Sequence, residues 1–426
     1  MKVLLVNVFV MGENNATGVT LKNMLYKLPG AELCEYCADT FCEKKGLPGV
    51  VFYQADEGDD PVRYMINKIR GNKGNYGRQE PAPFFLTAGN PIKELIHGII
   101  DCSPFRINQE VMSKITDFAP DVIYTLGGSI KLLKTSLKLA KKLQKPIVFH
   151  CMDDWRSCIY TASVLSYPFH FYINHLIRKV HKYAVVNLAI CEDMAEIYER
   201  DYKIPYSYAS NCVFEFNEDE YCAGKDGMLV VFSGGLHFGR GNTLLKLAGE
   251  IERLNTEGYK IHLEIYAPEP QAAGYKDRFV FEHTTLLPYV DKEKQMENLK
   301  RADALLHVES ENSKEIQYMK LSFSTKLVEY FAAGRTVIGF GNKEIASLKY
   351  IEKNQCGAVA ENMCQFRELL ISLLNHQNTR ENYAEKSYIT AKTYHSRESV
   401  QERIFKVFET SGIQWRKKED EIKDKD

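Results

Sequence analysis

The segment from residue 320 to 341 combines a helix start with two charged side chains. It reads KLSFSTKLVEYFAAGRTVIGFG and places Lys326 directly after the pair Ser324 and Thr325. Serine and threonine favour the N-cap of a helix, and the free backbone N–H groups of a helix start attract anions. A lysine in the first turn opposes the helix dipole, so its presence there indicates that an anion binds. The pattern predicts a phosphate held by Ser324, Thr325 and Lys326.

Glu329 lies one helical turn beyond Thr325 and Lys326. A carboxylate at this place could accept the hydroxyl protons of a ribose, as acidic residues do in other nucleotide sites. The alternative is a Lys–Glu pair on a solvated helix face, which contributes only ~0.3 kcal/mol to helix stability.

A second candidate is the glycine-rich loop GGLHFGRGNTLL, which follows the apolar run MLVVFSGG. Gly234 and Gly239 have the spacing of a P-loop, but Arg240 and Gly241 replace its lysine and its hydroxyl residue. A nucleoside triphosphatase is therefore disfavoured. The loop, which includes Gly235, instead predicts a phosphate cradle in which Arg240 contacts two oxygens of a diphosphate, with a plain turn as the alternative.

The loop MGENNATGVTLKNML after the first apolar run carries Gly12 and Gly18. Thr17 or Thr20 could cap a helix from about Val19, whose start would be a further anion site; an ordinary turn is the alternative. The spacing is not G-x-G-x-x-G, which argues against a nicotinamide or flavin cofactor.

His150 stands in PIVFHCMDDW, near the end of an expected strand. A single histidine is more often structural, but ligands of open parallel sheets bind beyond the carboxyl ends of the strands. We therefore expect a functional role for His150, with Asp153 and Asp154 orienting it or meeting the substrate.

The elements that must position these residues alternate between strand and helix. Residues 3–10, 121–126 and 147–152 are continuous apolar runs typical of buried parallel strands. Between the last two, Ile130, Leu133, Leu137 and Ala140 share one helix face. A second alternating series starts at 228. We expect an α/β protein with a first domain at 1–216, a linker at 217–227, a second domain at 228–395 and a helix with a charged tail at 396–426.

Composition excludes several classes of function. The 426 residues carry a net charge of −1, which removes a general argument for nucleic acid as partner. Eighteen apolar residues never run together, and no signal-peptide pattern opens the chain, so a cytoplasmic protein is expected. Eleven scattered cysteines suit free thiols. Cys34, Cys37 and Cys42 could be three zinc ligands, but a fourth is not evident nearby, and we expect neither metal nor cofactor.

Residues 63–78 form a basic stretch interleaved with apolar residues. Its cations are Arg63, Lys68, Arg70, Lys73 and Arg78. A solvated surface excursion explains it, and so does a patch resting on anionic lipid headgroups, which would make the protein peripheral on the inner face of a membrane.

Several of these motifs carry a family resemblance. STKLVEYFAAGRTVIGFG, preceded by ADALLHVES, resembles the nucleotide-sugar half of retaining GT-B glycosyltransferases, and more narrowly the bacterial group 1 (family 4-like) enzymes that build capsular and exopolysaccharides. GGLHFGRG is similar to their GRLxxxKG loop, PIVFHCMDDW to their strand end with a histidine and acidic residues, and NATGVTLKNML to their first loop. The match runs from near residue 1 to about 395.

The resemblance implies two doubly wound, Rossmann-like domains facing a central cleft. It implies transfer of a sugar, with retention of configuration, from UDP or GDP to a lipid-linked or oligosaccharide acceptor in surface polysaccharide biosynthesis. Glu329 would hold the ribose, and His150 would contact the sugar with Asp153 nearby. The residues that would surround the diphosphate are Gly18, Gly235, Arg240, Ser324, Thr325 and Lys326.

The chain departs from the family pattern at two positions. Gly235 stands where an arginine is expected, and Leu321 where the first glutamate of E-x7-E is expected. Glu309, Glu311 or Glu315 could substitute for that glutamate. A nucleotide-sugar epimerase of the same fold and a non-catalytic scaffold subunit are therefore the alternatives to a glycosyltransferase.

Overall fold

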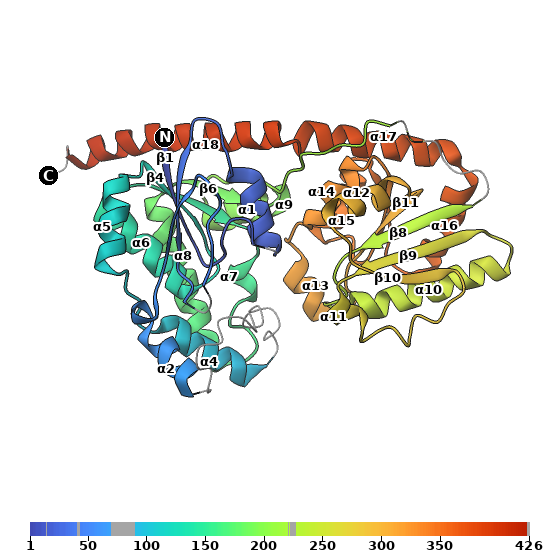
Figure 1. Ribbon diagram of the computed structural model, residues 1–426, viewed down its shortest axis with the longest axis horizontal. Helices are drawn as coiled ribbons and strands as arrows, with labels where there is room; N and C mark the ends of the chain where they lie inside the picture. Colours follow the sequence, from blue (N-terminus) through green and yellow to red (C-terminus); the bar gives the residue numbers. More distant parts are fainter. Residues whose placement is uncertain (14, 41–42, 70–89, 220, 222–226, 424–426) are drawn as a thin grey trace. The chain divides into compact units, whose positions relative to one another are not determined.

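The structure is a computed structural model, and it describes residues 1–13, 15–40, 43–69, 90–219, 221 and 227–423. The chain divides into two compact units (Figure 1). Unit 1 comprises Met1–Ser210 and Gln401–Asp426, and unit 2 comprises Asn211–Val400. Each unit is a parallel sheet with helices packed against it, as expected for doubly wound α/β domains.

Unit 1 is built on a seven-stranded sheet of order β3-β2-β1-β4-β5-β6-β7, in which each neighbouring pair is parallel. The order reverses between β1 and β4, which is where a doubly wound sheet opens a crevice at its carboxyl edge. The strands are β1 (Lys2–Asn7), β2 (Glu32–Cys37), β3 (Val51–Gln54), β4 (Val122–Leu126), β5 (Ile147–Cys151), β6 (Ala184–Ala189) and β7 (Ser207–Tyr208).

The helices of unit 1 follow the apolar periodicity of the sequence. In α6 (Ile130–Leu143), Ile130, Leu133, Leu137 and Ala140 are buried as predicted, and the Ser129 side chain caps the helix start. The other helices are α1 (Ala16–Leu25), the 3₁₀ helix η1 (Glu57–Asp59), α2 (Pro61–Ile69), α4 (Pro91–Cys102), α5 (Gln109–Phe118), α7 (Trp155–Cys158), α8 (Tyr167–Tyr183) and α9 (Glu192–Tyr202).

Unit 2 is built on a six-stranded parallel sheet of order β10-β9-β8-β11-β12-β13. Its strands are β8 (Met228–Ser233), β9 (Ile261–Ala267), β10 (Thr284–Pro288), β11 (Ala304–Val308), β12 (Thr336–Phe340) and β13 (Gly357–Ala360). Its helices are α10 (Arg240–Thr256), α11 (Glu269–Ala272), α12 (Lys292–Lys300), α13 (Ser313–Met319), α14 (Thr325–Ala332), α15 (Ala346–Lys353), α16 (Met363–Asn375) and α17 (Gln377–Tyr394).

The last helix, α18 (Arg397–Lys423), begins where a C-terminal helix was expected and continues through the segment expected to be a charged tail. From Gln401 on it belongs to unit 1, where the Phe408 ring lies edge-on to Tyr124 with centroids 6.2 Å apart. Gln401 Nε2 donates to the Tyr26 carbonyl oxygen at 3.2 Å. The boundary between the units also comes earlier than expected, at Asn211. The place of α18 and the boundary at Asn211 both depend on contacts between residues far apart in sequence, and helical periodicity does not reveal such contacts.

Two further sequence expectations concern metals and membranes. Cys34 and Cys37 are buried free thiols whose pKa burial raises, while Cys42 lies outside the described residues. Across the described ranges, groups of three or more His, Cys, Asp or Glu side chains arranged to hold a metal ion are not found. Within those same ranges, helices with the length and apolar character needed to cross a membrane are also not found.

Candidate functional site

The candidate site lies in unit 2 at the carboxyl ends of β8 and β11. There the loop after β8, the start of α10 and the start of α14 bring Gly234, Arg240, Glu309 and Lys326 together. These elements come from distant parts of the chain, and parallel strands place their carboxyl ends at one edge of the sheet.

Lys326 lies directly over the backbone of Gly234. A Cβ atom at position 234 would be 1.5 Å from the lysine Nζ, so only glycine leaves room for the ammonium group. Lys326 Nζ also lies 5.5 Å from the centroid of the Phe232 ring. The structure therefore brings the glycine-rich loop and the start of α14 together.

Burial and the neighbouring charge of Arg240 lower the pKa of Lys326 to about 7, although Glu309 and Glu329 act in the opposite direction. A lysine with this pKa carries a proton only part of the time at neutral pH. A bound anion would favour its charged form, because an opposite charge nearby raises the pKa of an ammonium group. The site is thus electrostatically suited to a phosphate.

Arg240, the first residue of α10, is held in place by hydrogen bonds to residues at the end of β11 and by a contact with Met319 Sδ at 3.5 Å. Its Nε donates to the Val308 carbonyl oxygen at 3.0 Å, and Nη2 donates to Glu309 Oε2 at 2.7 Å. The other carboxylate oxygen of Glu309 lies 3.0 Å from Nε2 of His307. Burial opposes ionisation of Glu309, yet Arg240 and His307 outweigh it and lower the pKa of Glu309 to about 2. Glu309 therefore carries a permanent negative charge that orients the arginine.

This geometry distinguishes the three glutamates that the sequence left open. Glu309 is buried beside Arg240, whereas Glu311 pairs with Lys246 at 2.6 Å on the surface. Glu315 accepts a hydrogen bond from Ser310 Oγ. Of these three glutamates, Glu309 is the one that contacts Arg240, the residue that we predict to bind phosphate.

The start of α14 differs from the prediction in its capping. Ser324 occupies the N-cap position, but its side chain does not make the expected capping hydrogen bond. The Ser324 backbone N–H instead donates to Ser347 Oγ at 3.0 Å. The phenol of Tyr330 anchors the helix, since the Ser233 N–H donates to its oxygen at 2.9 Å.

Glu329 is half-buried on α14, where its carboxylate accepts a hydrogen bond from Gln295 Nε2 at 3.2 Å. Burial raises the pKa of Glu329, and the charges of Lys292 and Lys326 oppose the rise. Sequence reasoning missed Gln295, Tyr330 and His307. Tyr330 and His307 lie within the quoted motifs STKLVEYFAAGRTVIGFG and ADALLHVES, but the motifs alone gave them no role. Gln295 lies in no motif, and only the packing of α12 against α14 brings it to Glu329.

The lack of a side chain at Gly235 is explained by the nearby ring of His237. A Cβ atom there would lie 2.5 Å from the imidazole ring of His237. The backbone N–H of the next residue, Leu236, donates to Gln271 Oε1 at 2.6 Å. Burial, together with the charges of Arg240 and Lys326, lowers the pKa of His237 to about 4, so the ring is neutral at pH 7. The loop after β8 is thus held by His237 within it and by Gln271 of α11.

His150 does not have the exposed position that its predicted role requires. Strand β5 continues to Cys151, and the His150 side chain is fully buried, with Nδ1 hydrogen-bonded to the Tyr124 hydroxyl of β4. Burial lowers the pKa of His150 to about 4. This is the environment of a structural histidine, and it does not support contact with a sugar. Asp153 follows the strand and is half-buried.

Gly18 also has a local structural role. The helix α1 begins at Ala16 and its N-cap is Asn15, not Thr17 or Thr20 as expected. Asn15 Oδ1 accepts the Gly18 N–H at 2.8 Å. A Cβ atom at Gly18 would lie 2.8 Å from the Val10 carbonyl oxygen, so close packing of the loop requires glycine there.

The basic stretch at 63–78 is only partly described. Arg63 lies 3.8 Å from the Asp39 carboxylate and is not an exposed cation. Nothing is described of the Lys68 side chain, and Arg70, Lys73 and Arg78 lie outside the described residues.

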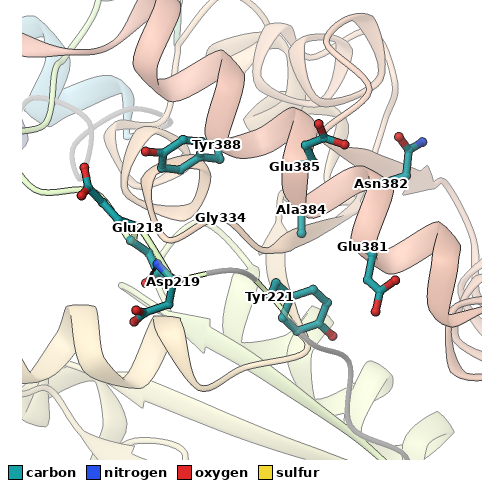
Figure 2. A pocket seen from close by; sticks show the side chains of 10 residues that line it. Glu218, Asp219, Tyr221, Gly334, Glu381, Asn382, Ala384, Glu385 and Tyr388 are labelled. Atoms are coloured by element: carbon teal, nitrogen blue, oxygen red, sulfur yellow. Dashed lines mark hydrogen bonds between the residues drawn. The ribbon is translucent and has the colours of Figure 1, made fainter.

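A hollow of about 550 Å³ lies elsewhere in unit 2 (Figure 2). Carboxylates dominate its polar lining, which includes Glu218, Asp219, Glu381 and Glu385. Such a lining would repel a diphosphate. The hollow is therefore distinct from the candidate site.

The chain, with its two parallel-sheet units, has the GT-B fold of several solved glycosyltransferase structures, and this fold class was predicted from the sequence. Sucrose-phosphate synthase from Thermosynechococcus elongatus matches with a TM-score of 0.63 and 10% identity, over 96% of this chain and 98% of the other. HepE from Anabaena, in complex with UDP, matches with a TM-score of 0.61 and 11% identity, over 96% and 100% of the two chains.

WaaG, a glycosyltransferase involved in lipopolysaccharide biosynthesis, matches with a TM-score of 0.57 and 12% identity, over 95% of this chain and 99% of WaaG. No family model matches the chain, and no curated protein matches it in sequence. Sequence identities of 10–12% show a shared fold only, so the activity of this chain is inferred from the residues of its candidate site.

Proposed function

We propose that the protein is a glycosyltransferase that uses a nucleoside-diphosphate sugar as donor. The observation that carries the proposal is the pair of cations, Arg240 and Lys326, held at the carboxyl ends of β8 and β11 in a GT-B fold. Two fixed cations suit a diphosphate, and Glu329, held by Gln295, suits the hydroxyls of a ribose.

We propose UDP as the nucleotide to test first, with GDP as the alternative. The solved HepE structures contain UDP and UDP-glucose, and a solved trehalose-6-phosphate protein from E. coli is bound with UDP-2-fluoro glucose. The acceptor in our proposal is a lipid-linked or oligosaccharide glycan of a surface polysaccharide, and the lipopolysaccharide role of WaaG supports this choice.

The proposed reaction needs charge stabilisation more than a dedicated nucleophile. The bond between the anomeric carbon and the diphosphate breaks, and the acceptor oxygen bonds to the same face of that carbon. Because the acceptor oxygen bonds to the face that the diphosphate leaves, the configuration is retained. The acceptor proton passes to the leaving phosphate, and the proposed step uses no metal or cofactor. Lys326, Arg240 and the backbone N–H groups at the start of α14, including those of Thr325 and Lys326, would stabilise the charge that develops on the diphosphate.

Asp153 and His150, the residues of unit 1 that were expected to contact the sugar, have different roles in this proposal. Asp153, which follows the carboxyl end of β5, stays a candidate for contact with sugar or acceptor. The buried His150 is assigned to the packing of the sheet instead.

Thermal unfolding with UDP, GDP, ADP, CMP and their sugars tests the donor. A ligand at 100 times its Kd adds ~2.7 kcal/mol to the free energy of unfolding. We expect one nucleotide to stabilise the wild type, and Lys326→Ala and Glu329→Ala to lose that effect. The control is Lys246→Ala, since Lys246 is an exposed residue of α10 away from the cluster.

Product analysis then separates the alternatives. Transfer to an added glycan supports a glycosyltransferase, while conversion of the free donor into its epimer would assign the site to an epimerase. If no nucleotide shifts the unfolding temperature, the proposal fails and a scaffold role takes its place.

A further inference from the structure

A hollow of about 120 Å³ lies in unit 1, between α6 and residues 103–107 of the connection from α4 to α5. Three lysines of α6 line it, and we therefore call it the lysine hollow. Its lining residues are Lys131, Lys134 and Lys138, the hydroxyl residues Ser103 and Thr135, and the apolar residues Phe105 and Ile107. In contrast to the acidic hollow of unit 2, the described lining includes no carboxylate.

The three lysines share one face of α6. Their spacing is i, i+3, i+7, and side chains at these positions are neighbours on a helix surface. Like charges at such spacings repel each other and destabilise the helix. An anion bound among the ammonium groups would relieve this repulsion.

Two of the three ammonium groups lack a carboxylate partner among the described residues. Lys131 forms an ion pair with the buried carboxylate of Asp60. Lys134 Nζ donates to the Cys102 carbonyl oxygen at 3.4 Å, which is a neutral partner. Ion pairs of Lys134 or Lys138 are not found in the part of the chain that the structure describes. The lysine hollow therefore has two positive charges that no direct contact neutralises.

The charge of Lys138 acts on Asp59, a buried carboxylate of η1, without forming an ion pair with it. Burial raises the pKa of Asp59 to about 6, and Lys138 opposes the rise. Asp59 Oδ2 accepts the Asp56 N–H at 3.1 Å, as part of the capping box of η1. Asp59 thus fastens its own helix and leaves the Lys138 ammonium group free to bind another anion.

Thr135 adds a hydroxyl that the fold does not use. Its side chain is 4% exposed, and within the described residues its hydroxyl makes no hydrogen bond. A helical threonine commonly bonds to the carbonyl four residues earlier, as Thr116 of α5 does to Met112 at 2.8 Å. The other hydroxyl of the lining is occupied, because Ser103 Oγ donates to the Ile100 carbonyl oxygen at 2.6 Å. Thr135 can therefore donate to a ligand in the hollow.

The size of the lysine hollow limits the ligand. Its volume is roughly four times the ~30 Å³ that one water molecule takes up in the liquid. A tetrahedral oxyanion fits this space, whereas a nucleotide does not. Phe105 and Ile107 are half-buried and replace water on the apolar side, which strengthens the attraction between an anion and the lysines.

We propose that the lysine hollow binds a phosphate dianion, either inorganic phosphate or the terminal phosphate of a small monoester. Lys134 and Lys138 would contact its oxygens through charge-assisted hydrogen bonds, and Thr135 would donate a further one. Two ammonium groups match the double charge of a monoester, while a phosphodiester carries a single charge. This site lies in unit 1, apart from the donor-side cluster of unit 2, and does not depend on the proposed glycosyltransferase activity.

Hydrogen exchange followed by mass spectrometry tests the proposal on the full chain. We expect the amides of 103–107 to exchange more slowly with inorganic phosphate or methyl phosphate than with chloride at equal ionic strength. Dimethyl phosphate should protect them at least about tenfold more weakly, because it has lost one charge. A titration with glucose 6-phosphate distinguishes the two sources, since tighter binding than that of inorganic phosphate would identify a sugar phosphate as the ligand.

Variants locate the effect in the hollow. Lys134→Gln with Lys138→Gln should weaken the protection by inorganic phosphate about tenfold or more. Thr135→Val, which keeps the shape of the side chain, should weaken it roughly fivefold. The matched control is Lys141→Gln with Lys142→Gln, which removes the same charge from exposed positions of α6 outside the hollow and should bind phosphate like the wild type.

Two further measurements separate this site from the rest of the protein. Lys326→Ala should keep the protection of 103–107, because its effect is confined to the donor side. Equal unfolding temperatures of the hollow and control variants exclude loss of fold as the cause of weaker binding.

Three outcomes would overturn the proposal. The first is equal exchange of 103–107 in phosphate and chloride. The second is an equal loss of protection in the hollow and control lysine variants, which would show a general effect of charge. The third is protection by dimethyl phosphate as strong as that by methyl phosphate, which would rule out selection of a dianion.

Discussion

At the scale of single residues, the site is a balance of four ionisable groups, namely Arg240, Lys326, Glu309 and Glu329. Arg240 is fixed in place by its ion pair with Glu309, whereas Lys326 packs over Gly234 and the Phe232 ring. Burial disfavours the charged form of Lys326 while the site lacks an anion, and a bound diphosphate would favour that form. Affinity for the donor should therefore be linked to the protonation of Lys326.

We predict that UDP binding takes up a proton at pH 8. The pKa of Lys326 is about 7 without ligand, so the amine is mostly neutral at pH 8 and must gain a proton to pair with phosphate. Above pH 7 the affinity should fall by up to about tenfold per pH unit, and below pH 7 this dependence should vanish.

Calorimetry at pH 8 in buffers of different ionisation enthalpy measures the proton directly. The wild type should take up close to one proton per UDP bound, and Lys326→Gln should take up much less. Equal proton uptake by both proteins would show that another group titrates.

At the scale of elements, the site depends on how loops and helices meet. The loop after β8 must let the side chain of Lys326 from α14 pass over its backbone, and α12 must present Gln295 to Glu329. Both requirements concern contacts between elements distant in sequence.

We predict that Gly234→Ala abolishes nucleotide binding. The new methyl group would occupy the place of Lys326 Nζ, 1.5 Å away, and displace the ammonium group from the site. The matched control is Gly249→Ala within α10, where no atom lies within 4 Å of the added Cβ. That control should bind UDP normally and gain up to ~1 kcal/mol in free energy of unfolding. Titration calorimetry and urea unfolding measure both effects; retained binding in Gly234→Ala would contradict the site.

We predict that Gln295→Ala weakens UDP more than 2′-deoxy-UDP. Gln295 donates to Glu329, so its loss frees the carboxylate that we assign to the ribose hydroxyls. A lost hydrogen bond of ~1 kcal/mol corresponds to roughly a fivefold loss of affinity for UDP. Competition titrations with the two nucleotides measure the difference, and an equal loss for both would place the ribose elsewhere.

At the scale of the whole molecule, unit 1 includes the distant C-terminal helix. The rings of Phe405 and Phe408 belong to this part of α18, and Phe408 is fully buried beside Tyr124. Gly30 lies so close to Phe405 that a Cβ atom there would be 2.9 Å from the ring. The end of the chain is therefore part of the first unit's core.

We predict that Phe408→Ala lowers the free energy of unfolding of unit 1 by about 3–5 kcal/mol, because it leaves a cavity beside the sheet. Glu409→Ala, at the exposed neighbouring position, should change it by less than ~0.5 kcal/mol. Urea denaturation followed by tyrosine fluorescence measures both. A Phe408→Ala protein as stable as the control would contradict the assignment of this helix to unit 1.

The sequence by itself determined the fold class, and it singled out Arg240, Lys326 and Glu329 as candidate site residues. Strand and helix periodicity is a pattern of residues close together in the sequence. The glycine-rich loop before Arg240 and the segment that carries Lys326 and Glu329 are local patterns as well. Tertiary structure decided which glutamate joins Arg240, that Gln295 holds Glu329, and that His150 points into the sheet. It also decided that α18 belongs with unit 1. Burial and pairing arise from contacts between residues far apart in sequence, and no local pattern records them.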